Sequence, residues 1–548
     1  MFGANGLQDF DYVIVGAGSA GSVIAARLSE SGQHSVLVLE AGGAARHPWI
    51  RIPIGYGKTF YDTRFNWAYT ADPDPGIMDR AMYWPRGKGL GGSSAINAMV
   101  WVRGAPSDYA EWGQVALGWD WPDVEPVFRR IERWTGAAHP ARGVSGPLTV
   151  TDVSEHMHPL SRAYVQAAQE AGFAFNPDYN AERFDGVGYY QITTRNGMRA
   201  SAAGAYLRPA MRRGNLRVET GAHVTRVLFE GGRATGVTYR QNGQMHQVRA
   251  RSEVVLCGGA LNSPQLLMLS GIGDGAHLQE MGIDVVHPLA QVGRNLSDHL
   301  GIDHLYTATR PSLNQELRPV WGKLKAALRY GLFRTGPLSM SLNHGGGFVQ
   351  VHEGDGAPDL QLYFSPLSYS KAPSGTRPLM SPDPFPAFRL GFSPCKPTSR
   401  GVVSLRTPDP FDPPRMQPNY LSTEDDCAMM VAGSRLVRRI AEAPSLRAVT
   451  VAEKEPGSAC ESDAQLLDHA RRACGTVFHQ CGTCAMGRDP ARSVVDARLR
   501  VHGVAGLRVA DASVFPTIPS GNTNAPAMMV GEKAADVLLE DAKHGGAS

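Results

Sequence analysis

The chain has the length and composition of a soluble globular protein of more than one domain. It holds 548 residues, 43% hydrophobic and 8% aromatic, and a single hydrophobic core stops growing at about 250–300 residues. Its 54 Lys and Arg against 51 Asp and Glu give a net charge of +3, and no basic run interleaved with aromatics marks a nucleic-acid surface. We therefore expect two domains and a small-molecule partner rather than nucleic acid.

Targeting signals and disulfides are also not expected. The first ten residues, MFGANGLQDF, lack the basic and apolar regions of a signal peptide, and no apolar run approaches the roughly 18 residues of a membrane span. The seven cysteines are odd in number and mostly scattered, which fits a reducing compartment. The sequence predicts a cytoplasmic protein.

Residues 11–43 form the first strong pattern, a strand, tight turn, helix and second strand. The apolar run Tyr12–Val15 stops at G-x-G-x-x-G, which opens a helix predicted over Ser22–Ser29. The second strand, Ser35–Leu39, ends at Glu40. An acid there can accept both hydroxyls of an adenosine ribose and argues against a 2′-phosphate. The pattern predicts FAD or NAD, and disfavours NADP.

Each glycine of this turn has a separate role. Gly16 permits the sharp turn, Gly18 lets the backbone approach a pyrophosphate, and Gly21 lets helix and strand pack closely. The helix N-terminus offers free N–H groups to the phosphates. A second glycine-rich stretch, residues 84–104, is predicted to lie against a flat group before a helix begins, although a plain glycine-rich turn is the alternative.

These stretches resemble the glucose–methanol–choline (GMC) oxidoreductases, which are FAD enzymes. The two glycine-rich segments, together with GGALNSPQLLMLSGIG at 258–273, are similar to the family's signature segments. The likeness continues through VGRNLSDH at 292–299 to a segment ending near Leu539. It implies an α/β fold: a Rossmann-type FAD-binding domain with a parallel sheet, plus a discontinuous substrate domain with an antiparallel sheet and flanking helices.

The resemblance also divides the chain into segments. Residues 1–155 are expected to be mainly FAD-binding domain with a flavin-covering loop, and 156–214 the first part of the substrate domain. Residues 215–300 continue the FAD-binding domain, 301–474 the substrate domain, and 475–548 carry the catalytic residues. Alternating patterns further predict four strands and two helices: 215–219, 224–230, 235–240 and 247–256, with helices over 161–171 and 423–443.

One amphipathic segment has two interpretations. Four apolar residues fall on one helical face, with basic residues elsewhere: Trp321, Leu324, Leu328 and Leu332, with Lys323, Lys325 and Arg329. An ordinary packing helix is the preferred interpretation, and a lid or membrane-surface helix is the alternative.

The candidate catalytic residues lie in the last segment. Alcohol oxidation by a flavin needs a base and a polar group that holds the substrate oxygen, which His479 and Asn522 can supply. A structural histidine is the alternative, because the chain has 17. In the family the catalytic histidine follows an apolar–aromatic pair, as Val477 and Phe478 precede His479. The helix that begins near Pro526 could stabilise negative charge on the flavin.

The resemblance implies a set of cofactor residues. Val224 would lie beside the adenine, Asn97 beside the isoalloxazine, and Asp511 beside the pyrophosphate and ribityl, although a strand-end turn is the alternative for Asp511. Ile96 stands where members with covalently attached flavin have histidine, so FAD should bind noncovalently. The expected set is Gly16, Gly18, Ser19, Ala20, Gly21, Glu40, Ala41, Gly91, Gly92, Ser93, Asn97, Ala98, Val100, Val224, Asp511, Ala512, Asn522, Thr523 and Asn524.

A metal site is not expected. Cys474, His479, Cys481 and Cys484 crowd into eleven residues without a second pair at matching spacing. A dithiol redox pair would need a thioredoxin-like context, which is missing.

The substrate is predicted to be an uncharged alcohol. Residues 337–350, where choline-type members are expected to place an acid, contain no carboxylate, so choline is disfavoured. No second G-x-G-x-x-G follows a predicted strand, which counts against NAD(P)H as electron donor. The sequence thus predicts FAD-dependent alcohol oxidation, with dioxygen or a redox partner as acceptor. A non-redox cyanohydrin lyase and an FAD-containing scaffold stay open, and oligomeric state is not predicted.

Overall fold

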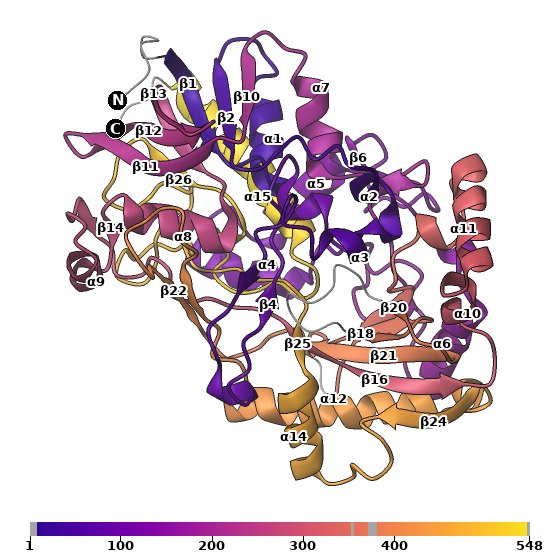
Figure 1. Ribbon diagram of the computed structural model, residues 1–548. Coiled ribbons are helices and arrows are strands. Elements are labelled where there is room, and N and C mark those ends of the chain that lie inside the picture. Colours follow the sequence, from indigo (N-terminus) through magenta and orange to yellow (C-terminus); the bar gives the residue numbers. More distant parts are fainter. Residues whose placement is uncertain (1–7, 352–355, 371–380, 545–548) are drawn as a thin grey trace.

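Two sheets built from distant segments carry the fold (Figure 1). The computed structural model describes residues 8–351, 356–370 and 381–544. The first seven residues, on which part of the signal-peptide expectation rests, lie outside the described residues. No helix in the described ranges is long and apolar enough to cross a membrane.

The first sheet contains the predicted dinucleotide turn. Its strands run in the order β10 (Leu216–Thr220), β2 (Val36–Glu40), β1 (Gln8–Val15), β13 (Gln244–Leu256), β12 (Arg233–Gln241) and β11 (His223–Glu230), with β26 (Leu507–Val509) also on β13. The strands from β10 to β13, and β26, pair in parallel, whereas β12 and β11 are antiparallel. The α/β prediction is confirmed for this part, with an antiparallel extension at one edge.

Two helices far apart in the sequence pack together on this sheet. Helix α1 (Ser19–Leu28) follows β1, and α15 (Asn524–Lys543) lies against it (Figure 1). The approach is close because position 531 is glycine: a Cβ there would lie 2.9 Å from the Cα of Ala20. The Arg27 guanidinium also donates to the carboxylates of Glu532 and Asp536. The packing brings the N-termini of both helices to one place.

The second sheet is antiparallel throughout, as predicted. It runs in the order β24 (Thr450–Glu455), β16 (Leu300–Ala308), β21 (Ala387–Pro394), β18 (Leu360–Ser365), β17 (Gly345–Val349) and β7 (Gly186–Tyr189), with β25 (Gly475–Thr476) also on β16. Helices α12 (Glu424–Glu442) and α6 (Pro159–Glu170) pack on it. A Cβ on Gly433 of α12 would meet the Phe392 ring at 2.3 Å, so the helix sits directly on the sheet. The segment limits given above stay a prediction.

Two local expectations are corrected. The loop after Gly91 leads into a short 3-10 turn, Gly92–Ala95, and the next α-helix, α4, begins only at Pro106. The packing interpretation of the amphipathic helix is wrong. In α11 (Val320–Phe333) only Ala326 and Tyr330 are buried, while the predicted apolar stripe is exposed.

Candidate active site

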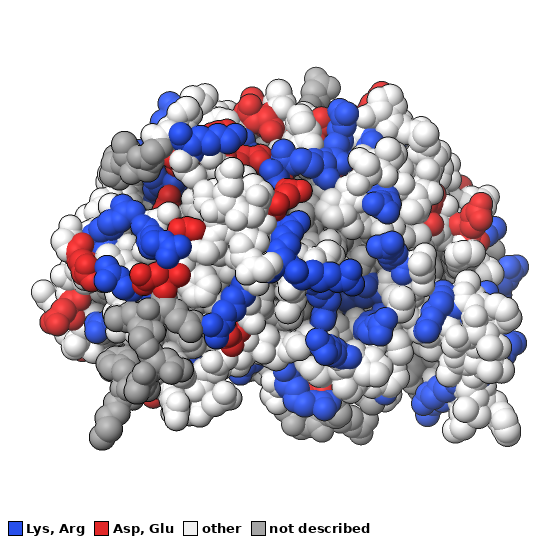
Figure 2. All heavy atoms as spheres, turned by 90° about the horizontal axis from the view of Figure 1, so that it is seen from above, with Lys and Arg blue, Asp and Glu red and all other residues white. Residues whose placement is uncertain are grey.

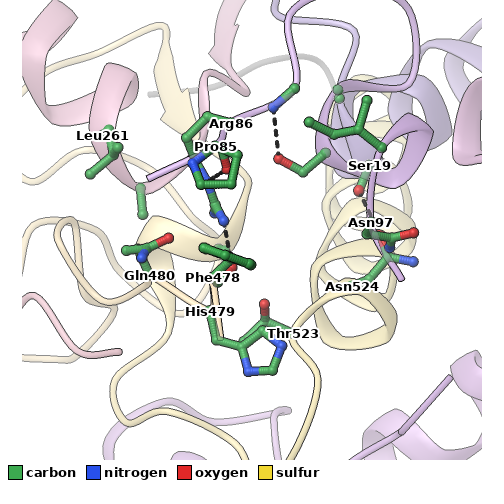
Figure 3. A pocket seen from close by; sticks show the side chains of 18 of the residues that line it. Ser19, Pro85, Arg86, Asn97, Leu261, Phe478, His479, Gln480, Thr523 and Asn524 are labelled. Carbon is green, nitrogen blue, oxygen red and sulfur yellow. Dashed lines mark hydrogen bonds between the residues drawn. The ribbon is translucent and has the colours of Figure 1, made fainter. Parts of the chain in front are cut away.

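A cavity of about 430 Å³ lies where elements of the two sheets meet. It is lined by the turn after β1, the loop around residues 85–100, the start of α8 (Gly259–Leu269), strands β16, β18 and β21, and the segments around 479 and 522. In Figure 3 the His479 imidazole lies beside Thr523, and Ser19, Asn97 and Asn524 line another side. All predicted site residues are therefore near this cavity.

The glycine turn is shaped as the motif predicts. Gly16 has a φ of 103°, and a Cβ there would lie 2.5 Å from the Cys257 carbonyl oxygen. A Cβ on Gly18 would meet no protein atom closer than 3.9 Å, so it would occupy the cavity instead. This is the open cradle that a closely approaching ligand requires.

Two of the predicted residues shape the cradle without lining the cavity. A Cβ on Gly21 would lie 2.0 Å from the Gly16 carbonyl oxygen, so Gly21 serves helix packing. Gly91 has a φ of 97°, and its Cβ would crowd Ala203 and Ala95 at 3.3 Å. The remaining residues of the predicted cofactor set, and His479, line the cavity.

Helices α1 and α15 present uncapped N-termini to the cavity. Neither Gly18 nor Thr523, their N-caps, makes a side-chain capping hydrogen bond. The Ser19 hydroxyl donates to Asn524 Oδ1 at 2.8 Å and joins the two helix starts. Free N–H groups and two positive helix ends suit an anionic pyrophosphate and a negatively charged ring edge. The chemistry of these donors fits a flavin dinucleotide.

Glu40 has a structural role that its motif does not reveal. Its carboxylate accepts from the backbone N–H of Ala17, Gly42 and Gly89, at 2.8–2.9 Å. Burial raises the pKa of Glu40, and the three hydrogen bonds oppose that rise. Glu40 thus ties the two glycine-rich loops together and also lines the cavity. Its contact with a ribose stays a prediction.

Asp511 and Asn97 are likewise held by hydrogen bonds within the chain. Asp511 accepts from the N–H of Gly259 and Ser513, both at 2.8 Å, and from the Ser263 hydroxyl at 2.6 Å. The predicted strand-end turn is therefore present, and it also anchors α8. The Arg199 guanidinium donates to Asn97 Oδ1 at 2.7 Å. Burial lowers the pKa of Arg199 to about 9. No local sequence pattern indicates this contact, because 102 positions separate the two residues.

His479 is buried and fully hydrogen-bonded. Its backbone N–H donates to Asp298 Oδ1 at 2.8 Å, its Nδ1 lies 2.9 Å from His299 Nδ1, and its Nε2 lies 3.1 Å from the amide Nδ2 of Asn522. The structure thus brings together the two predicted catalytic residues, which are 43 positions apart.

The neighbours of His479 determine which of its nitrogens carries hydrogen. His299 Nε2 lies 3.0 Å from the carbonyl oxygen of Cys395, which can only accept, so this nitrogen is protonated. Burial lowers the pKa of His299 to about 4, so His299 is neutral and its Nδ1 is an acceptor. His479 Nδ1 must then donate, which leaves the lone pair on His479 Nε2, beside Asn522.

Electrostatics also keep His479 neutral. Burial, then the neighbouring His299, then Arg86 lower its pKa well below the ordinary value. The Arg86 guanidinium donates to the Phe478 carbonyl oxygen (Figure 3), and its partial burial lowers its pKa to about 10. A neutral imidazole with its lone pair at Nε2 can accept a proton from a hydroxyl group.

Asp298 holds the backbone of this segment. Besides the His479 N–H, its carboxylate accepts from the Thr476 hydroxyl at 2.6 Å, the Gln480 amide at 2.8 Å and the Tyr420 hydroxyl. Asp298 and His299 lie in the motif VGRNLSDH at 292–299, which predicted no role for either residue. The one available signal was their position at the end of this motif.

Comparison with known proteins decides the family. The GMC oxidoreductase description matches residues 10–301 and again residues 397–531. The chain belongs to this family. It is 40% identical to an alcohol dehydrogenase [acceptor] of Pseudomonas putida, over 97% of this chain and 96% of that one. It is 41% identical to the mitochondrial choline dehydrogenase of Mus musculus, over 97% and 90%.

The fold and the cofactor agree with this membership. A formate oxidase of Aspergillus oryzae, studied for its FAD modification, superposes with a TM-score of 0.90 at 26% identity, over 98% of this chain and 99% of that one. This GMC oxidoreductase is therefore an FAD-binding flavoprotein, as predicted. A flavin within the cavity would be held by the turn after β1 and the N-termini of α1 and α15.

The remaining part of the GMC cavity is mixed in character. Apolar and aromatic side chains share it with a few polar groups: Tyr56, Phe60, Ile302, Leu342, Asn343, Tyr363, Ser365, Tyr369 and Phe392. Asp303 also lines it and lies outside residues 337–350, where choline-type members are expected to place an acid. Asp303 Oδ2 accepts from Arg389 Nη1 at 3.2 Å, so its charge already has a partner. Residues 337–350 hold no carboxylate, as the sequence shows, but the cavity contains a paired one from strand β16.

The three cysteines that were considered as metal ligands in this GMC oxidoreductase are buried. Cys481 and Cys484 are free thiols, and burial raises the pKa of Cys484 well above its ordinary value. The Cys474 sulfur accepts a hydrogen bond from the Arg80 guanidinium at 3.0 Å. Among the described residues no group of three or more His, Cys, Asp or Glu side chains could hold a metal ion.

Proposed function

We propose that this GMC oxidoreductase oxidises an uncharged primary or secondary alcohol to the aldehyde or ketone, with His479 as the base. The observation that carries the proposal is the chain of hydrogen bonds from the Cys395 carbonyl through His299 to His479. It leaves an unprotonated Nε2 in the cavity wall, next to an amide donor.

The two residues have complementary tasks. His479 Nε2 takes the hydroxyl proton, and the Asn522 amide donates to the substrate oxygen without competing for that proton. Gln361 Nε2 lies 3.4 Å from Asn522 Oδ1, which favours the amide orientation with its NH₂ group toward His479. Bound FAD supplies the acceptor for hydride.

The proton on His479 can be stabilised where it forms. His299 accepts from Nδ1, so the imidazolium keeps one hydrogen bond while Nε2 faces the substrate oxygen. The uncapped N-terminus of α15 adds a positive partial charge to the same end of the cavity. These groups are fixed by packing before substrate arrives, which lowers the reorganisation that the reaction requires.

The nature of the cavity supports a neutral substrate and a noncovalent flavin. Ile96 lines the cavity and has no nucleophile to offer a flavin, in line with the noncovalent FAD that the sequence predicts. A quaternary ammonium is bound by a free carboxylate or by an aromatic cage. The carboxylate in this part of the cavity, Asp303, is engaged by Arg389, so the aromatic side chains alone would have to bind such a cation. Choline is the second candidate, because the mouse relative is a choline dehydrogenase and one acid does line the cavity.

In the deciding experiment, aliphatic alcohols, aryl alcohols, sugar alcohols and choline are each added anaerobically to the FAD-loaded protein. The visible absorbance of the flavin is followed after each addition. Bleaching with an uncharged alcohol supports the proposal. Release of carbonyl and cyanide from a cyanohydrin without bleaching indicates a lyase instead, and silence across the panel indicates a scaffold. Reoxidation of the bleached protein by dioxygen or by an artificial acceptor then separates oxidase from dehydrogenase.

Mutation of the base provides the matched test. His479→Ala should keep FAD yet slow flavin reduction by about 10²–10⁴-fold, the usual contribution of a positioned base. His246→Ala, on β13 and outside the cavity lining, is the control and should reduce at the wild-type rate. Reduction of His479→Ala within a few-fold of wild type would refute the assignment.

A further inference from the structure

Helix α11 exposes apolar side chains that nothing in the described structure covers. Trp321 is 82% exposed, Leu324 53%, Leu328 65% and Leu332 66%. These positions are spaced by three or four residues, so they form one stripe along the helix. The buried residues Ala326 and Tyr330 lie on the opposite side, because they are about half a turn away from the stripe. The helix is attached by its less apolar side and turns its apolar side outward.

The surroundings of the stripe are basic. Residues 317–351 contain no Asp or Glu but hold five cations: Arg318, Lys323, Lys325, Arg329 and Arg334. Within the described ranges none of these five forms an ion pair with a carboxylate. Exposed clusters of cations beside an apolar stripe are typical of helices that lie on anionic lipid surfaces.

Neighbouring segments extend this basic surface. Burial raises the pKa of Tyr330, and the nearby cations Arg334 and Arg51, the last residue of α2 (Pro48–Arg51), partly oppose that rise. Burial and then the nearby Lys323 lower the pKa of Lys58, so cations of different segments lie close to one another. Seen from above (Figure 2), Lys and Arg gather over the middle and right of the molecule, toward the side where Figure 1 shows α11. The surface is therefore positive over more than one element.

The attachment of α11 connects this surface to the cavity wall. Ala326 belongs to a buried cluster that includes Tyr56 and Leu342, and both of these line the cavity. The Tyr330 hydroxyl donates to the Gly197 carbonyl oxygen at 3.0 Å, which fixes the helix on the body of the protein. The exposed stripe is thus held rigidly on the outer side of the cavity.

We propose that α11 docks this protein on the surface of an anionic lipid bilayer, with Trp321, Leu324, Leu328 and Leu332 in the interfacial region and the surrounding cations at the headgroups. One apolar stripe gives reversible binding that is weakened by salt, because attraction to anionic lipid supplies part of the affinity. The proposal concerns binding alone and stands whether or not the proposed alcohol oxidation is correct.

The test is co-sedimentation of the FAD-loaded full chain with two kinds of vesicle, phosphatidylcholine alone and phosphatidylcholine mixed with phosphatidylglycerol in equal parts. Binding to the anionic vesicles, and about tenfold weaker binding of the double variant Leu324→Glu, Leu328→Glu, are expected. The control is Leu117→Glu, another exposed leucine (80%) that lies outside α11 and should bind like wild type. Lys323→Glu, Lys325→Glu should weaken binding to anionic vesicles.

Three results would overturn the proposal. The first is equal or absent binding to both vesicle types, and the second is full binding by the double leucine variant. The third is a dimer of the wild-type chain in solution that the double variant abolishes, with no vesicle binding; the stripe would then be an interface between two copies. Flavin absorbance and melting temperature of each variant, matched to wild type, ensure that lost binding is not lost folding.

Discussion

His299 and His479 share a hydrogen bond between their Nδ1 atoms, 2.9 Å apart, although 180 residues separate them in the sequence. One of the two must donate and the other accept, and the Cys395 carbonyl oxygen on His299 Nε2 settles that His479 donates. A buried residue that does not itself line the cavity thus determines which nitrogen of the base is free. We call His299 a positioning residue.

Replacing His299 tests this arrangement. His299→Leu removes the acceptor for His479 Nδ1–H, so the hydrogen can move to Nε2, and we expect the rate of flavin reduction to fall by about 10–100-fold, as for other residues that orient a reactive imidazole. His299→Asn places an amide oxygen near the former Nδ1 and should recover most of the rate. Stopped-flow reduction under anaerobic conditions measures both. Equal losses in the two variants would point to a merely structural role.

The pH dependence of kcat/KM should reflect the low pKa of His479. A base must be unprotonated to act, and burial, His299 and Arg86 all hold its pKa well below 6.5. We therefore expect kcat/KM to stay constant from pH 8 down through 6.5, with the acid limb below that value. Arg86→Gln removes one neighbouring cation and should move the limb toward higher pH. A limb at or above pH 6.5 in the wild type would contradict the burial argument.

Buried histidines should also make the fold sensitive to acid. Burial lowers the pKa of His344 to about 3, whereas in the unfolded chain the value is near 6.5. The unfolded state then binds more protons below pH 6.5, so stability is complete above that pH and falls between about 6.5 and 3. At pH 5 this one residue costs about 2 kcal/mol.

The variant His344→Met isolates this contribution. Its melting temperature should drop less between pH 7 and pH 5 than that of wild type, because the group that must stay neutral is gone. The exposed His156→Met serves as the control and should behave like wild type. An unchanged pH dependence in His344→Met would show that His344 is not the group that resists protonation.

The sequence allowed the local parts of the site to be predicted, and the structure shows why. The turn at Gly16 and Gly18 and the strand ending at Glu40 are specified by neighbouring residues, so periodicity and glycine spacing are sufficient. His299 and Arg86 act on His479 across long sequence separations, and no local pattern encodes such contacts. Asp303 was not predicted, because the acid was expected within residues 337–350, whereas several strands of the second sheet line the cavity.

The prediction that helix α11 packs by its apolar side was wrong for a different reason. Its spacing of apolar residues was read correctly, since α11 covers Val320–Phe333. The apolar side of an amphipathic helix normally faces the core, but periodicity alone does not show whether that side is buried or turned to solvent. The absence of acids between 317 and 351 was the available signal that this helix differs from a packing helix.

The glycine cradle offers a test that separates cofactor binding from folding. Gly18→Val would place its side chain in the cavity, because a Cβ there meets no protein atom closer than 3.9 Å. We expect loss of most bound FAD with an apoprotein melting temperature near that of the wild-type apoprotein. Gly16→Ala should instead lower both the amount of bound FAD and the apoprotein melting temperature. Its Cβ would lie 2.5 Å from the Cys257 carbonyl oxygen, and the backbone has a φ of 103°. The flavin-to-protein absorbance ratio and the two melting temperatures distinguish the cases.

The pair Asp303–Arg389 should control discrimination between neutral and cationic alcohols. Arg389→Gln removes the partner of Asp303 and leaves a free carboxylate in the cavity wall, so the ratio of kcat/KM for choline to that for a neutral alcohol should rise by about tenfold. Arg389→Lys keeps a cation and should leave the ratio near wild type. Because an unpaired buried charge destabilises a protein, Asp303→Asn, Arg389→Gln is the companion variant. It lacks the carboxylate and should show no gain toward choline, so an equal gain in both would remove Asp303 from the account of specificity.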